Sequence, residues 1–165
     1  MTHDEMVVLV DDRNRITGQI RRWEMRAHRL LHRATYVLVF NSSGQLFVQK
    51  RTQTKDVYPG YWDPAAGGVV QVGESYEESA ARELSEELGI SDVALTRLFD
   101  FRFEDEASRV WGRAFSCVYD GDMKFQLEEV EGGEFLAPEE VINRAKSEPF
   151  TPDGLYVVQR YLKKE

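Results

Sequence analysis

The sequence has only one cysteine, Cys117, so neither an internal disulfide nor a cluster of thiolate zinc ligands is possible. It also has no apolar run as long as a membrane span, and we expect no membrane association. The first residues are polar and acidic, whereas a signal peptide begins with basic residues and an apolar core. These absences predict a protein of a reducing, cytoplasmic compartment.

Basic residues are outnumbered, because 21 lysines and arginines stand against 29 aspartates and glutamates, and the net charge is −8. An acidic balance disfavours binding to a nucleic acid polymer and suits a site that gathers metal ions before an anionic substrate arrives. The chain of 165 residues has no repeat, low-complexity segment or linker. We therefore expect one domain over residues 1–165.

Apolar periodicity and turn residues predict alternating strands and helices. A β-hairpin is expected over 6–20 and a short helix over 22–31, so that 1–32 form an N-terminal hairpin with a helix packed on it. The hairpin is a candidate edge for a homodimer. Further strands are expected at 33–40, 45–51, 93–103, 109–119 and 134–137, and further helices at 138–146 and 155–163.

A helix with clear ends is predicted after the glycine pair Gly67-Gly68. Ser75 is the expected N-cap, Glu78 stands three residues later as its capping-box partner, and Gly89 is the expected stop. The glycine pair allows a close approach of the backbone just before the helix begins. The sequence thus predicts a tight turn followed by a well-capped helix.

Three glutamates share one side of this helix, because the spacing i, i+3, i+4 brings Glu83, Glu86 and Glu87 together. Carboxylates so close repel one another unless a cation lies among them, and hard oxygen ligands favour Mg²⁺ or Mn²⁺. Arg82 can reach Glu86 one turn away and Glu74 before the helix, and would then orient a carboxylate rather than bind metal. The alternative interpretation is a solvated acidic helix face.

The whole stretch resembles the Nudix box, whose defining positions are filled by Gly68, Glu74, Arg82, Glu83, Leu84, Glu86, Glu87, Gly89 and Ile90. The resemblance implies an α/β fold, the Nudix α/β/α sandwich, with a mixed sheet. It also implies a loop-helix-loop that holds divalent cations against a diphosphate, with water attacking phosphorus. The expected activity is that of a Nudix hydrolase acting on a small-molecule diphosphate, a nucleoside diphosphate derivative or similar.

The first 90 residues are also similar to the Nudix branch that includes type 1 isopentenyl diphosphate isomerase, with matches such as Lys50-Arg51, Lys55 and Pro59-Gly60. That isomerase needs a catalytic cysteine and a metal-binding histidine in the glycine turn, where this sequence has Ala66 and Gly68. Without a positioned acid-base pair the isomerisation cannot proceed. The first 90 residues therefore resemble the isomerase, whereas the expected reaction is hydrolysis.

Two histidines, His28 and His32, align with metal-binding positions of that branch, His28 only loosely. Because the partner ligands are missing, we interpret both as packing or hydrogen-bonding residues. The isomerase glutamates on the strand after the box are also missing, since the alignment finds Trp111 and Arg113 there.

Arg51 and Lys55 match positions that contact diphosphate in the isomerase, and a diphosphate needs cations besides the metal. Their alternative interpretations are an exposed strand-end arginine and a solvated loop lysine. Trp62, beside the glycine turn, is a candidate to stack on a base, and packing under the loop is the alternative. These three are the expected substrate-binding residues.

The resemblance implies that Glu83, Glu86, Glu87 and a carbonyl of the glycine pair, with Gly68 preferred, hold the metal. Catalysis is assigned to Glu83 and Glu86 with Arg82, and to a loop glutamate, Glu129, because an acidic pair before a strand recurs in the family. Which carboxylate acts as base stays open among these and the neighbouring loop glutamates. A non-catalytic module that binds a nucleotide or diphosphate is the third hypothesis, after the hydrolase and the isomerase.

Overall fold

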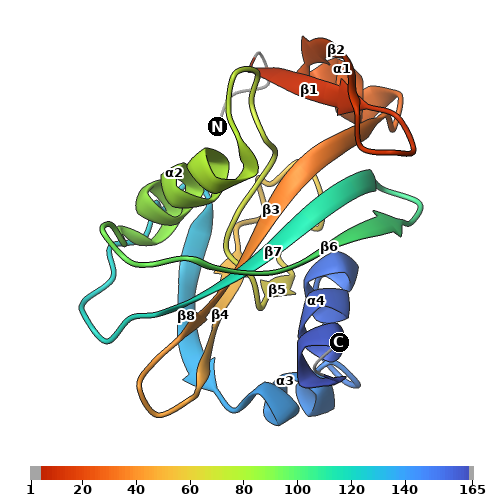
Figure 1. The fold of residues 1–165 in the computed structure, drawn as a ribbon. Helices are drawn as coiled ribbons and strands as arrows, with labels where there is room; N and C mark the ends of the chain where they lie inside the picture. The colour runs from red at the N-terminus through yellow and green to blue at the C-terminus, as the bar shows by residue number, and fades with distance from the viewer. Residues whose placement is uncertain (1–4, 164–165) are drawn as a thin grey trace.

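A mixed sheet of eight strands forms the centre of the computed structural model, which describes residues 5–163 (Figure 1). The central strand β3 pairs in parallel with β7 along its whole length, and antiparallel with β1 near its start and with β4 at its end. Neighbouring strands pair in the order β2-β1-β3-β4-β5. In addition, β6 pairs with β7, and β8 pairs with β4. The strands are β1 Met6–Val10, β2 Ile16–Arg21, β3 Leu31–Phe40, β4 Leu46–Arg51, β5 Trp62–Asp63, β6 Thr96–Glu104, β7 Arg109–Val118 and β8 Val130–Leu136.

Helices cover both faces of this sheet, because alternate residues of the buried strands point to opposite sides (Figure 1). On β3, Tyr36 and Leu38 join the core beneath α3 (Pro138–Arg144) and α4 (Pro152–Lys163). The intervening Val37 and Val39 join the core beneath α2 (Tyr76–Leu88). The predicted α/β sandwich with a mixed sheet is therefore confirmed, and between residues 5 and 163 no helix is long and apolar enough to cross a membrane.

The helix α2 begins and ends where the sequence predicts. Ser75 accepts a hydrogen bond from the Glu78 amide, and the Glu78 side chain accepts one from the Ser75 amide, so the capping box is complete. Gly89 ends the helix in the left-handed conformation, with φ of 69°. The apolar stripe of the helix, which includes Ala80 and Leu84, is buried against the sheet, and Glu83 and Glu87 adjoin this stripe and are buried with it.

The N-terminal hairpin forms as expected, and its outer strand β2 is an edge of the sheet. The helix that follows, α1, spans Arg22–Ala27, so the predicted extension to Leu31 is wrong. His28 caps the helix and Arg29 adopts a positive φ of 51°, which turns the chain. Leu31 then begins β3, because it pairs with Arg109 of β7, a contact that local periodicity does not contain.

Other boundaries differ by a few residues. The strand β6 begins at Thr96 rather than 93, and β8 begins at Val130 rather than 134, opposite Arg51 of β4. α3 ends at Arg144 and α4 already begins at Pro152. The two-residue strand β5 was not predicted, since two residues carry no alternation; its hydrogen bonds with β4 hold the chain just before the glycine turn.

Candidate active site

The three glutamates of α2 occupy different environments. Glu83 and Glu87 are buried, with 1% and 3% of their surface exposed. The side chain of Glu86 is 43% exposed, on the outer edge of the same helix face. The helix therefore presents two enclosed carboxylates and one that is partly exposed to solvent.

The glycine turn lies directly over the buried carboxylates. A Cβ atom on Gly68 would lie 2.6 Å from Glu83 Oε2, and one on Gly67 would lie 2.0 Å from the carbonyl oxygen of Thr35. The Gly67 amide donates to Glu87 Oε1 at 3.2 Å, while the Gly68 carbonyl accepts from the Thr35 amide at 2.9 Å and from its hydroxyl at 3.3 Å. Only glycine allows this approach, and the Gly68 carbonyl is turned towards β3.

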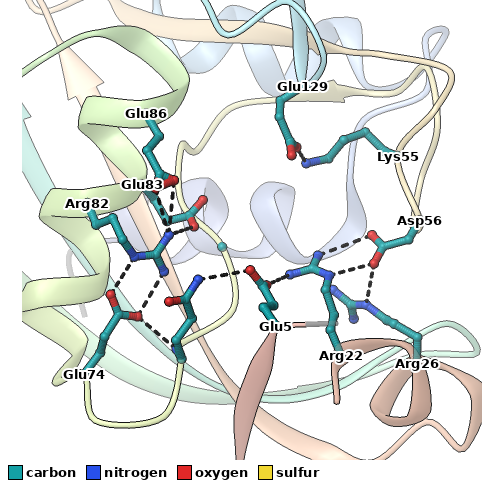
Figure 2. Close-up of polar contacts among 12 residues, drawn as sticks. Glu5, Arg22, Arg26, Lys55, Asp56, Glu74, Arg82, Glu83, Glu86 and Glu129 are labelled. Atoms are coloured by element: carbon teal, nitrogen blue, oxygen red, sulfur yellow. Dashed lines mark hydrogen bonds and ion pairs between the residues drawn. The ribbon is translucent and has the colours of Figure 1, made fainter. Parts of the chain in front are cut away.

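Arg82 forms hydrogen bonds with three surrounding carboxylates (Figure 2). Its guanidinium donates to Glu74 at 2.5 and 2.9 Å, to Glu83 at 2.6 Å and to Glu86 at 3.3 Å. The contacts with Glu74 and Glu86 are those that the spacing predicts. A planar guanidinium with five donors suits this arrangement, because it can hold several carboxylates in fixed orientations.

Burial has the largest effect on the pKa values of Glu83 and Glu87. Removal from water and, second to it, the neighbouring charge of Glu83 raise the pKa of Glu87 to about 8. Burial also raises the pKa of Glu83, against the opposing effect of Arg82. Such carboxylates are stabilised in their ionised form by a nearby cation, so the donor set fits a hard divalent ion. In residues 5–163, however, no three acidic, histidine or cysteine side chains converge into a ready-made metal site, and the Arg82 guanidinium contacts both Glu83 and Glu86.

The loop over 52–61 brings a basic group to the same place. The Lys55 ammonium forms an ion pair with Glu129, and both side chains are 8% exposed (Figure 2). The positive charge of Lys55 opposes the rise in the pKa of both Glu83 and Glu87, whereas the negative charge of Glu129 adds to the rise in the pKa of Glu87. The structure therefore brings both predicted loop residues, which lie on opposite sides of α2 in the sequence, to the α2 carboxylates.

Arg51 and Trp62 are placed differently. The Arg51 guanidinium donates to the carbonyls of Val57 at 2.8 Å and Tyr58 at 3.2 Å, and to Asp63 at 3.3 Å, so it holds the loop in shape. Trp62 stacks on Phe150 with ring centroids 6.4 Å apart and lies outside the cavity lining. Its position corresponds to the packing alternative.

A cavity of ≈ 60 Å³ lies beside the glycine turn. Its lining includes Gly67 and Gly68 from the turn, Arg51 and Lys55 from the loop and its strand, and the α1 residues Arg22 and Arg26. The two α1 arginines escaped the sequence analysis. Their spacing of four residues on a short helix was the available signal, but nothing local connected that helix with the glycine turn.

His32 also borders the cavity and is 1% exposed. Its Nδ1 lies 2.9 Å from the Leu30 carbonyl oxygen, and because that oxygen can only accept, Nδ1 carries the proton. Burial, with help from the nearby charge of Arg26, lowers the pKa of His32 to about 3. His32 is therefore a neutral, hydrogen-bonded histidine, as interpreted from the sequence, and His28 is exposed at the end of α1.

Known proteins resemble this chain over most of its length. The family model described as NUDIX domain matches residues 30–160. The chain is 46% identical over 158 residues to the Nudix hydrolase PA4841 of Pseudomonas aeruginosa, covering 96% of this chain and 94% of that protein. It is 45% identical over 160 residues to the Nudix hydrolase YfcD of Escherichia coli K12, covering 97% and 88%. The crystal structure of DR0079 from Deinococcus radiodurans superposes with a TM-score of 0.82 at 30% identity, covering 94% of this chain and 98% of that one.

Proposed function

The chain belongs to the NUDIX domain family and is a Nudix hydrolase, and from that premise we propose that it is a divalent-metal-dependent enzyme that cleaves the phosphoanhydride of a small diphosphate-containing substrate. The observation that carries the proposal is the pair Glu83 and Glu87, buried under a glycine turn whose two glycines line a cavity together with basic side chains. Buried carboxylates next to a basic cavity suit metal and anion together.

The residues proposed to hold Mg²⁺ or Mn²⁺ are the carboxylates of Glu83, Glu86 and Glu87 with a carbonyl of the turn. Between the two carbonyls, that of Gly67 is favoured, since the Gly68 carbonyl already accepts two hydrogen bonds from Thr35. When bound, the ion neutralises phosphate charge and acidifies a coordinated water. The exposed side chain of Glu86 is free to turn away from Arg82 and complete the donor set.

The chain's own residues supply orientation and proton transfer. Arg82 fixes the direction of the Glu83 carboxylate through the 2.6 Å hydrogen bond, and Glu74 anchors Arg82 from the other side. Glu129 is the loop carboxylate proposed to take the proton of the attacking water, since Lys55 holds it beside the α2 carboxylates. Glu83 and Glu86 are the other candidates for that base.

The substrate is proposed to be a nucleoside diphosphate derivative or a similar small molecule. An isomerase is disfavoured by Ala66, which is 4% exposed and carries no acid or base. The similarity of the first 90 residues to the isomerase branch stays a prediction. A homodimer through the edge strand β2 also stays a prediction.

The test is a screen for release of phosphate or monophosphate products over a panel of diphosphate compounds, including isopentenyl diphosphate, with Mg²⁺ or Mn²⁺. We expect metal-dependent release that falls by at least about 100-fold in Glu86→Gln and Glu87→Gln. Glu77→Gln is the matched control, because it removes the same charge from the same helix at the ion pair with Arg113. Glu77→Gln should retain activity.

Three other outcomes would contradict the proposal. Release that continues without metal would remove the divalent ion from the mechanism. Conversion of isopentenyl diphosphate without phosphate release would establish the isomerase instead. Tight Mn²⁺ and diphosphate binding with no turnover across the panel would favour a non-catalytic binding module.

A further inference from the structure

The cavity beside the glycine turn is lined by four basic side chains, those of Arg22, Arg26, Arg51 and Lys55. Two of them, Arg22 and Arg26, come from α1 (Arg22–Ala27), which precedes the residues 30–160 that the family model matches. Part of the cavity wall is therefore supplied by a segment outside the matched domain. Figure 2 shows this arginine pair across an opening from Glu83 and Glu86.

Three of the four basic groups are already committed to partners. Arg22 donates at 2.8 Å to each of two carboxylates, those of Glu5 and Asp56. Arg51 donates hydrogen bonds to two loop carbonyls and one carboxylate. Lys55 is held in its ion pair with a glutamate. Each of these contacts shapes the loop or ties it to the N-terminal segment, so none of the three needs a ligand to satisfy its charge.

Arg26 differs from the others. Its Nε lies 3.4 Å from Asp56 Oδ2 and its Nη1 lies 3.5 Å from Ser108 Oγ, and both distances are longer than any hydrogen bond of the other three basic side chains. Asp56 is shared with Arg22, which holds it at 2.8 Å. A guanidinium has five donors, and the Arg26 side chain is only 16% exposed, so its remaining donors are largely removed from water. A desolvated cation with unused donors is stabilised by an anion.

We propose that Arg26 is a substrate-binding residue that donates to a phosphoryl oxygen of the diphosphate in the cavity. The proposal rests on the proposed function and names a binding residue for it outside the matched domain. Arg26 and the two glycines of the turn over Glu83 line the same cavity, so a group bound there lies between them. Its ≈ 60 Å³ is roughly four times what one water molecule requires, enough for a small anionic group.

The acidic residues of the cavity are oriented so that they leave this side to an anion. Asp63 accepts from the Ala65 amide at 3.0 Å and from Arg51, and Asp153 accepts the Tyr36 hydroxyl at 2.7 Å. Both belong to the side of the cavity formed by β5 and the start of α4, whereas Arg26 belongs to the α1 side. The cavity thus has a basic side and an acidic side, and the phosphate is assigned to the basic one.

The experiment measures binding of inorganic pyrophosphate to the Mn²⁺-loaded protein by titration calorimetry, together with the KM and kcat of a panel substrate. The variant is Arg26→Gln, and Arg21→Gln is the matched control, because it removes the same charge five residues earlier, at the end of β2, from an exposed position outside the cavity lining. We expect the pyrophosphate Kd to rise about 10-fold to 100-fold in Arg26→Gln, the range of one charge-assisted hydrogen bond. Arg21→Gln should stay within about twofold.

A binding role also predicts that KM rises more than kcat falls, while Mn²⁺ affinity and the melting temperature stay those of the wild type. If Arg26→Gln lowers the melting temperature, Arg26→Lys decides: it keeps the charge but loses the planar fork, and we expect an intermediate Kd. A pyrophosphate Kd unchanged in both variants overturns the proposal, as does a wild-type protein that binds no pyrophosphate. Arg26-dependent pyrophosphate binding by a protein that hydrolyses no panel compound would uphold the binding residue and overturn the proposed function.

Discussion

His32 offers a direct test of how the fold treats a buried titratable group. The side chain is enclosed at the start of β3, and its protonated Nδ1 donates to the Leu30 carbonyl oxygen at 2.9 Å. Burial lowers its pKa to about 3. The perturbation is His32→Asn, which keeps a side-chain donor near the Leu30 carbonyl and removes the titrating ring.

The direction in which stability changes with pH follows from the number of protons that His32 binds in the folded and unfolded states. Because the folded pKa of His32 is about 3 and the unfolded value is about 6.5, the unfolded chain binds a proton between these pH values and the folded chain does not. The contribution of His32 to stability is therefore complete above about pH 6.5 and is lost as the pH falls towards 3. At pH 5 the loss is about 1.5 pH units at 1.36 kcal/mol each, or about 2 kcal/mol.

The assay is urea unfolding of the wild type and His32→Asn at pH 7 and at pH 5, with the free energy of unfolding extrapolated to water. Carboxylates that titrate in both proteins cancel in the comparison, so the wild type should lose about 2 kcal/mol more than the variant. An equal loss in the two proteins would refute the reasoning, because it would mean that His32 accepts its proton in the folded state.

Two further predictions concern the backbone around the carboxylates. Ser75→Ala should lower the free energy of unfolding by about 1 kcal/mol, because it removes the N-cap of α2, whereas Ser75→Asp should preserve the cap. Urea unfolding measures both variants, and an unchanged free energy of unfolding in Ser75→Ala would show that the capping box does not stabilise the protein. Gly73→Ala, at φ of 86° with nothing within 4 Å, should cost about 1–2 kcal/mol of backbone strain. Gly67→Ala should cost at least about 2 kcal/mol more, since its Cβ would also meet the Thr35 carbonyl oxygen, and equal losses would exclude that close approach.

Local features of the molecule were predictable because their causes lie within a few residues of one another. The capping box of Ser75 and Glu78, the stop at Gly89 and the shared side of Glu83 and Glu86 follow from the helical period alone. The continuous apolar run over 33–40 likewise predicted a central strand, and β3 is buried on both faces. The family pattern itself is of this local kind.

Contacts between distant segments could not be predicted in the same way. The end of α1 before Leu31 depends on the pairing of β3 with β7, about 80 residues later in the chain. The placement of Trp62 against Phe150, and of Arg51 against its own loop, is likewise set by partners that no local pattern specifies.

The sequence by itself determined the family and the helix that carries the three glutamates, since each is encoded by residue identity at short spacing. Tertiary structure alone decided which of the three α2 carboxylates are buried, because exposure depends on the glycine turn packed over Glu83 and Glu87. It also decided that Arg26 faces the same cavity as that turn. The physical reason is that solvation and charge at a site come from every segment that closes around it, and those segments meet only when the chain is folded.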